Sequence, residues 1–96
     1  MIVQAEISVY PLRVQRLSEP VEEFCRILRE HNLTIKITAM STFVIGEHQT
    51  LFDACSKAFE QLAAKYAIVV NMKISNACPA DGQDSKGFLQ NDKAAH

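Results

Sequence analysis

The chain lacks a cluster of basic residues and any long hydrophobic run, and each absence excludes a class of protein. The net charge is −1, and the lysines and arginines are scattered among aspartates and glutamates, whereas a nucleic-acid-binding protein concentrates its positive charge. No apolar stretch approaches the ~20 residues of a membrane span, and the first residues lack the basic region of a signal peptide. We therefore expect a cytoplasmic protein that binds neither nucleic acid nor membranes.

Cysteine and histidine are also few, and their positions do not form a metal or redox motif. The three cysteines are far apart, without a Cys-x-x-Cys pair or the pattern of a disulfide framework. Cys25 and Cys55 fall on the apolar faces of two expected helices, where cysteine acts as a small hydrophobic residue. His31, His48 and His96 show no ligand spacing, and no nucleophile has an evident base beside it. We expect no metal, no cofactor and no enzymatic activity.

Three segments alternate between apolar and polar residues, which is the pattern of strands with one buried face. They are Ile2–Tyr10, Leu33–Ala39 and Ala67–Ser75. Phe43–Ile45 predicts a further short strand, joined to the preceding one by a tight turn near Met40–Thr42. Pro11 is expected to end the first strand. The pattern therefore predicts four strands.

Two amphipathic helices are expected between these strands. The first follows Ser18, a plausible N-cap, and its apolar stripe includes Val21 and Phe24. The second is expected to begin with a capping pair formed by Thr50 and Asp53.

The resulting order is strand, helix, strand, strand, helix, strand, which is the ferredoxin-like βαββαβ pattern of an α+β sandwich. We expect a four-stranded antiparallel sheet with both helices on one face, formed by residues 1–76. Residues 77–96 contain Pro79, Gly82 and Gly87 and show little periodicity, which predicts a flexible C-terminal tail.

The face of the sheet that the helices leave open carries the candidate functional residues. Short hydroxyl and amide side chains, one carboxylate and one aromatic ring suit a small polar heterocycle or an amino acid. A solvated face or a subunit interface remains possible on the pattern alone. The loop Pro11–Arg16 has no glycine for a phosphate cradle, and only Tyr10 could stack a nucleic-acid base. The expected open-face residues are Gln4, Glu6, Ser8, Tyr10, Lys36, Thr38, Met40, Thr42, Asn71 and Lys73.

Three segments resemble a known family. They are Glu6–Leu12, with its Tyr-Pro-Leu ending, Thr38–Glu47, with its Met-Ser-Thr motif, and Asn71–Ile74. Together they resemble the small thiamine-binding proteins, which are related to the thiamine/hydroxymethylpyrimidine-binding proteins of bacterial vitamin uptake. The resemblance covers roughly residues 1–76.

The resemblance implies a homo-oligomer, either a dimer or a tetramer, that binds thiamine (vitamin B1) or its hydroxymethylpyrimidine moiety without catalysis. The resemblance also implies that the ligand binds at the open sheet face, near subunit contacts, as it does in relatives of the family. The implied ligand-binding residues are Glu6, Ser8, Tyr10, Met40, Ser41, Thr42 and Asn71. Two alternatives stay open: a regulatory module that binds an amino acid at a subunit interface, and a purely structural oligomerisation domain.

Overall fold

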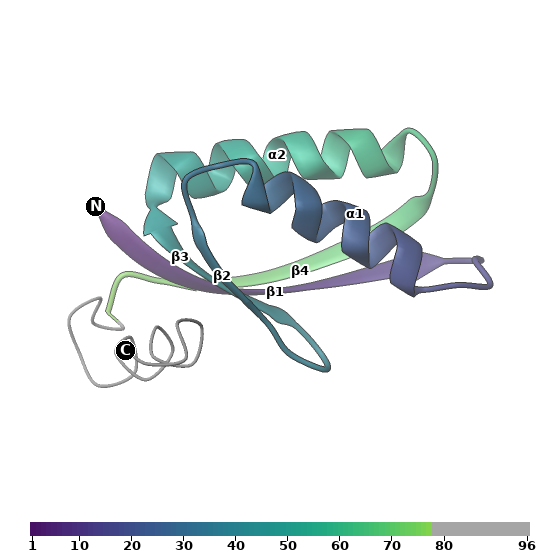
Figure 1. Cartoon of the computed structure of the whole chain (residues 1–96), viewed down its shortest axis with the longest axis horizontal. Coiled ribbons are helices and arrows are strands. Elements are labelled where there is room, and N and C mark those ends of the chain that lie inside the picture. Colours follow the sequence, from purple (N-terminus) through teal and green to yellow (C-terminus); the bar gives the residue numbers. More distant parts are fainter. Residues whose placement is uncertain (78–96) are drawn as a thin grey trace.

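The computed structural model describes residues 1–77. The tail predicted for residues 77–96 lies outside this range except for Ala77, and Cys78 and His96 lie outside it too. The elements are β1 (Ile2–Leu12), α1 (Ser18–Arg29), β2 (Thr34–Ile37), β3 (Thr42–Glu47), α2 (His48–Ala63) and β4 (Ala67–Ser75). The strands form one antiparallel sheet in the order β2-β3-β1-β4. Both helices lie on the same face of this sheet (Figure 1). The ferredoxin-like α+β fold predicted from the sequence is confirmed.

The core lies between the sheet and the two helices. The alternate residues Val3, Ala5 and Ile7 of β1 are buried there, because successive side chains of a strand point to opposite faces. Both helices bury their apolar stripes against them, with Leu28 of α1 and Leu51 of α2 fully covered. The other residues of β1, among them Glu6, Ser8 and Tyr10, are left on the open face.

Strand β1 is longer than expected and continues beyond Thr42, the first residue of the antiparallel strand β3. The last pair between β1 and β3 is Ile7 with Thr42, whereas pairing with β4 continues as far as Leu12 with Ala67. The expectation that Pro11 ends the strand is therefore wrong. A proline is tolerated there because that part of β1 has a strand on one side only. Among residues 1–77, no strand therefore pairs with the segment from Ser8 to Leu12 on its β3 side, and we call this side of β1 the free edge.

The helix starts also differ from expectation. Helix α2 begins at His48 instead of Thr50, because the Glu47 carboxylate caps it by accepting hydrogen bonds from the backbone N–H groups of Gln49 (2.8 Å) and Thr50 (3.3 Å). In α1, Ser18 is the first helical residue, and Leu17 occupies the N-cap position without a side-chain hydrogen bond. Within residues 1–77, neither helix is both long enough and apolar enough to cross a membrane.

The Glu47 cap makes one contribution to stability depend on pH. Partial desolvation raises the pKa of the Glu47 carboxyl, but hydrogen bonds from Gln49, the chain's terminal ammonium and Thr50, with the charge of His48, together lower it. A carboxyl group whose pKa is lower in the folded state stabilises the fold at any pH above its pKa in the unfolded chain. This contribution is lost as the pH falls through the pKa of the folded state. We expect Glu47→Gln to lower the melting temperature at pH 7, and we expect this loss to shrink as the pH falls below the usual pKa of a glutamate, about 4.3.

Thermal melts of the wild type and Glu47→Gln between pH 3 and pH 7 measure this difference. Glu60→Gln is the matched control, because Glu60 is an exposed residue of the same helix. An equal loss for Glu47→Gln at both ends of the pH range would contradict the capping role.

Candidate functional site

The loop between β2 and β3, residues 38–41, is a compact turn held by Thr38. The Thr38 N–H donates to the Ser41 carbonyl (2.8 Å), and the Thr38 hydroxyl accepts from the Ser41 N–H (3.0 Å). Side-chain bonds of this kind replace backbone pairing in turns. The position of Met40 and Ser41 is therefore set locally, by the loop itself.

This loop is tied to the open face of β1 by two hydrogen bonds. The Ser41 hydroxyl donates to Glu6 Oε2 (2.9 Å), and the Ser8 hydroxyl donates to the Met40 carbonyl (3.4 Å). Glu6, Ser8, Met40 and Ser41, which are far apart in the sequence, are thereby brought together. The Met40 side chain is 85% exposed, so it projects from this cluster and can cover a bound molecule.

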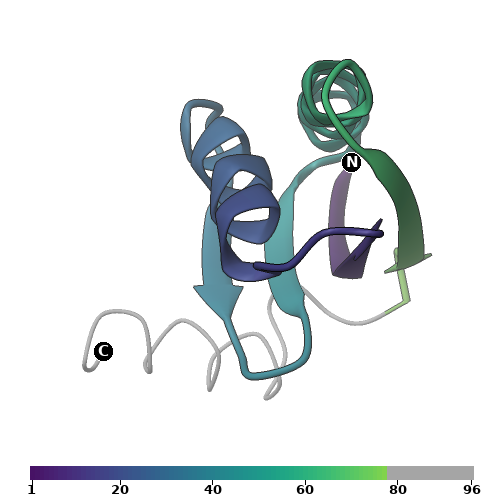
Figure 2. The ribbon, with the colours of Figure 1, turned by 90° about the vertical axis from the view of Figure 1, so that its right-hand side faces the viewer.

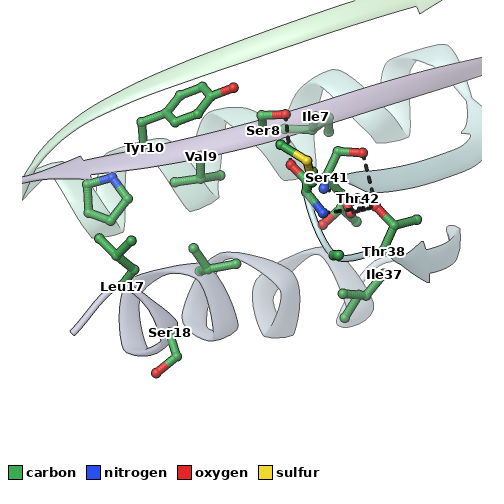
Figure 3. A pocket seen from close by; sticks show the side chains of 14 residues that line it. Ile7, Ser8, Val9, Tyr10, Leu17, Ser18, Ile37, Thr38, Ser41 and Thr42 are labelled. Atoms are coloured by element: carbon green, nitrogen blue, oxygen red, sulfur yellow. Dashed lines mark hydrogen bonds between the residues drawn. The ribbon is translucent and has the colours of Figure 1, made fainter.

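A groove of about 540 Å³ lies beside this cluster, next to the free edge of β1. The start of α1 and the loop 38–41 form its other walls (Figure 3). Its volume falls within the ~300–1,000 Å³ range of small-molecule sites. The lining residues are Ile7, Ser8, Val9, Tyr10, Pro11, Leu17, Ser18, Val21, Ile37, Thr38, Ala39, Met40, Ser41 and Thr42, none of which is charged. The groove is therefore mainly apolar, with hydroxyl groups at the loop.

The two sides of β1 contribute differently to this region. Ser8 and Tyr10 point away from α1, to the open face, whereas Val9 points toward α1 and Leu17 (Figure 3). The backbone of β1 from Ser8 onward runs along the groove, and no strand of the described part of the chain lies on its groove side. A free strand edge offers N–H and C=O groups that a planar heterocycle with its own donors and acceptors can pair with.

The predicted site residues lie on the open face of the sheet or in the loop beside it, with one exception. Ser8 is the cross-strand neighbour of Asn71, and Tyr10 that of Val69, so Asn71 and Tyr10 lie next to the Glu6–Ser41 cluster on the open face. Thr42 does not: its residue is only 5% exposed, and its hydroxyl lies 3.3 Å from the Cys25 sulfur, on the helix side of the sheet. The expectation that Thr42 lies on the open face is wrong, because the turn at residues 38–41 interrupts the alternation that placed it there.

The Cys55 thiol of α2 has a structural environment. Burial raises the pKa of the Cys55 thiol to about 11, so at neutral pH it is an unreactive thiol that packs against the core. In residues 1–77 no three histidine, cysteine or acidic side chains gather where they could hold a metal ion. The groups at the groove can hydrogen-bond, stack and enclose a ligand.

The sequence did not reveal the apolar wall of the groove. Leu17, Val21 and Ile37 line it, yet the sequence placed Leu17 in a loop and the other two on core-facing stripes. The only signal available was that Val21 begins the α1 stripe, one turn before the buried Phe24 and Cys25. A residue at the end of a core can either pack within the core or line a cavity. Which of the two occurs depends on small differences in the position of the helix.

Comparison with known proteins identifies the chain's relatives. A family profile described as thiamine-binding protein matches residues 5–83. A search of curated proteins finds no significant match.

Several solved structures share the fold. One is a hypothetical protein from Methanocaldococcus jannaschii, with a TM-score of 0.77, 20% identity, and coverage of 97% of this chain and 96% of that one. A Thermotoga maritima protein with a proposed role in thiamine biosynthesis or salvage has a TM-score of 0.76 and 18% identity, covering 90% of this chain and 95% of that one. A Bacillus cereus domain of unknown function has a TM-score of 0.73 and 20% identity, and the match covers 97% of this chain and 93% of that one. At these identities the likeness establishes the fold.

Proposed function

Because this chain belongs to the thiamine-binding protein family, we propose that it is a cytoplasmic homo-oligomer that binds thiamine or its hydroxymethylpyrimidine moiety without catalysis. The observation that carries the proposal is an uncharged groove whose Ser41 hydroxyl is hydrogen-bonded to a carboxylate, Glu6, just outside the groove lining. Thiamine joins a neutral aminopyrimidine ring to a cationic thiazolium ring, and its charge is complementary to that of Glu6. No resident cofactor is required.

The proposed binding mode uses the groove and the open-face cluster together. The aminopyrimidine lies along the free edge of β1, where the backbone and the hydroxyls of Ser8 and Ser41 can pair with its nitrogens. Tyr10 and Met40 cover the rings, since an aromatic face attracts a cation and a methionine adapts to irregular shapes. Glu6 holds the Ser41 hydroxyl at 2.9 Å and supplies the negative charge. Asn71, beside Ser8 on β4, provides a further polar contact.

Calorimetric titration of the full chain with thiamine, and separately with hydroxymethylpyrimidine, tests the proposal. Hydrogen bonds to charged groups contribute about 1.5–3 kcal/mol, so we expect Glu6→Gln to weaken thiamine binding by roughly 10- to 100-fold. The loss for hydroxymethylpyrimidine should be smaller, because that ligand lacks the cationic ring. Glu60→Gln, which removes the same charge from the exposed surface of α2, should bind both ligands like the wild type.

Two outcomes would contradict the proposal. One is the absence of heat at millimolar concentration of both ligands. The other is a thermal-shift panel in which an amino acid, and neither vitamin compound, raises the melting temperature, since a ligand that binds only the folded state stabilises it. That result would favour an amino-acid-binding regulatory module.

A further inference from the structure

A second hollow, of about 550 Å³, lies between the outer flank of α1 and the end of β2. Helix α1 lies over the β2 side of the sheet (Figure 2). The residues that line the hollow are Val21, Glu22, Cys25, Arg26, Arg29 and Ile37. Val21 and Ile37 also line the groove, so the two cavities adjoin at these two apolar side chains. A substituent on a molecule in the groove can therefore reach the hollow.

The hollow differs from the groove in its charge. The groove is lined by uncharged residues, whereas two arginines and one glutamate line the hollow. All three lie on one flank of α1, because Glu22, Arg26 and Arg29 are separated by four and three positions. Glu22 is nearest the groove, and Arg29 lies eight residues beyond Val21, about 12 Å along the helix. The hollow thus carries a net positive charge, and the arginines lie farther from the groove than the glutamate.

The two arginines differ in their partners. Among residues 1–77, Arg29 takes part in no salt bridge. Helical side chains lean toward the N-terminus of their helix, which is the groove end of α1. Arg26 pairs with Glu30 at 2.6 Å, but more than half of each side chain is exposed, and such a pair contributes little to stability. Arg29 is therefore available for an anion, and Arg26 can exchange Glu30 for a group of higher charge.

We propose that the hollow is a subsite for a phosphate ester, so that the protein prefers the phosphorylated form of its groove ligand to the free alcohol. This inference rests on the function proposed above. Thiamine carries a hydroxyethyl chain on its thiazolium ring, and a phosphate ester on that hydroxyl is an anion. The guanidinium of Arg29 can pair with two phosphate oxygens at once, and Arg26 adds a second positive charge.

The order of charges along the ligand matches the order along the protein. The thiazolium cation lies beside the loop 38–41, whose Ser41 is bonded to Glu6. The hydroxyethyl chain then passes between Val21 and Ile37, which both cavities share, and the phosphate enters the hollow. Arg26 follows Val21 by five residues, about 7.5 Å, a distance that a long side chain leaning toward the groove can largely cover.

Calorimetric titration of the full chain with thiamine monophosphate, and separately with thiamine, tests the subsite. We expect the ester to bind about 10-fold more tightly than thiamine, because charge-assisted hydrogen bonds form only with the phosphate. Arg29→Gln should remove most of this preference and leave the affinity for thiamine unchanged. Thiamine binding without tighter binding of the ester would overturn the subsite and leave the proposed function intact. Absence of binding by both compounds would overturn both.

Two further substitutions locate the phosphate. Lys57→Gln is the matched control, because it removes the same charge from an exposed position on α2, outside both cavities; the preference for the ester should persist. Arg16→Gln removes a charge from the loop before α1, which also lies outside both linings. Loss of the preference in Arg16→Gln, with its retention in Arg29→Gln, would overturn the subsite and assign the phosphate to that loop. Circular dichroism establishes that the variants are folded.

Glu22→Gln is expected to have the opposite effect. The Glu22 carboxylate lines the hollow and repels a phosphate there, so its removal should tighten binding of thiamine monophosphate by about 2- to 5-fold. The affinity for thiamine should not change. Higher salt should reduce the wild-type preference for the ester, because exposed charges are screened. Weaker ester binding by Glu22→Gln, or a preference that salt does not change, would contradict a phosphate held by these arginines.

Discussion

Val21→Trp is expected to lower the affinity for thiamine by at least about 100-fold while leaving the chain folded. Val21 lies on the first turns of α1, is half-buried, and lines the groove without belonging to the buried core. An indole at this position fills space that the ligand's rings require, and a closely packed wall cannot move aside without cost. Titration calorimetry measures the affinity, and the far-ultraviolet circular dichroism spectrum measures the helix content.

The control for this experiment is Glu22→Trp. Glu22 follows Val21 on α1 and is exposed, outside the lining of the groove. The Glu22→Trp substitution adds the same indole ring to the same helix, so any general effect of tryptophan on α1 appears in both variants. Wild-type thiamine affinity in Val21→Trp would show that the ligand binds elsewhere, most directly on the open sheet face alone.

Leu28→Ala is expected to have the largest effect on stability. Leu28 is fully buried in α1, against the sheet and α2. Truncation of a buried leucine costs about 2–5 kcal/mol, because apolar contacts are lost and a cavity remains. The whole stability of a small domain is about 5–15 kcal/mol. We therefore expect the midpoint of urea unfolding to fall by a large fraction of its wild-type value.

Leu17→Ala separates stability from binding. Leu17 is 59% exposed and lines the groove, so its truncation should change the free energy of unfolding by no more than about 0.5 kcal/mol. It should nevertheless weaken thiamine binding, since it removes part of the apolar wall. Similar unfolding midpoints for Leu28→Ala and Leu17→Ala would contradict the assignment of Leu28 to the core.

The sequence predicted the elements and the open face because their signals are local. Alternation along β1 separates Ala5 and Ile7 from Glu6 and Ser8, and burial in the structure follows it. Periodicity also identified the apolar stripes of both helices, although the α2 cap at Glu47 was missed. That cap comes from the last strand residue, whose carboxylate accepts hydrogen bonds from the backbone N–H groups of Gln49 and Thr50, so that Thr50 lies inside the helix and does not cap it.

The placement of Thr42 and the groove could not be predicted in the same way. Thr42 follows a turn, and one residue more or less in that turn sends its side chain to the opposite face. The groove depends on β1 running past the end of β3 and on α1 lying beside the free edge that results. Neither property is encoded within one segment.

By itself, the sequence determined the order of the elements, the buried faces of β1, β4 and both helices and, through the motifs at Tyr10 and Met40, the family. Those properties follow from periods of two and 3.6 residues and from short motifs, all of which can be read along the chain. Only the tertiary structure decided that Ser41 meets Glu6, that Thr42 turns to Cys25, and that an apolar groove opens beside β1. Such contacts join residues far apart in sequence, and their geometry is set by strand register and helix packing across the whole sheet.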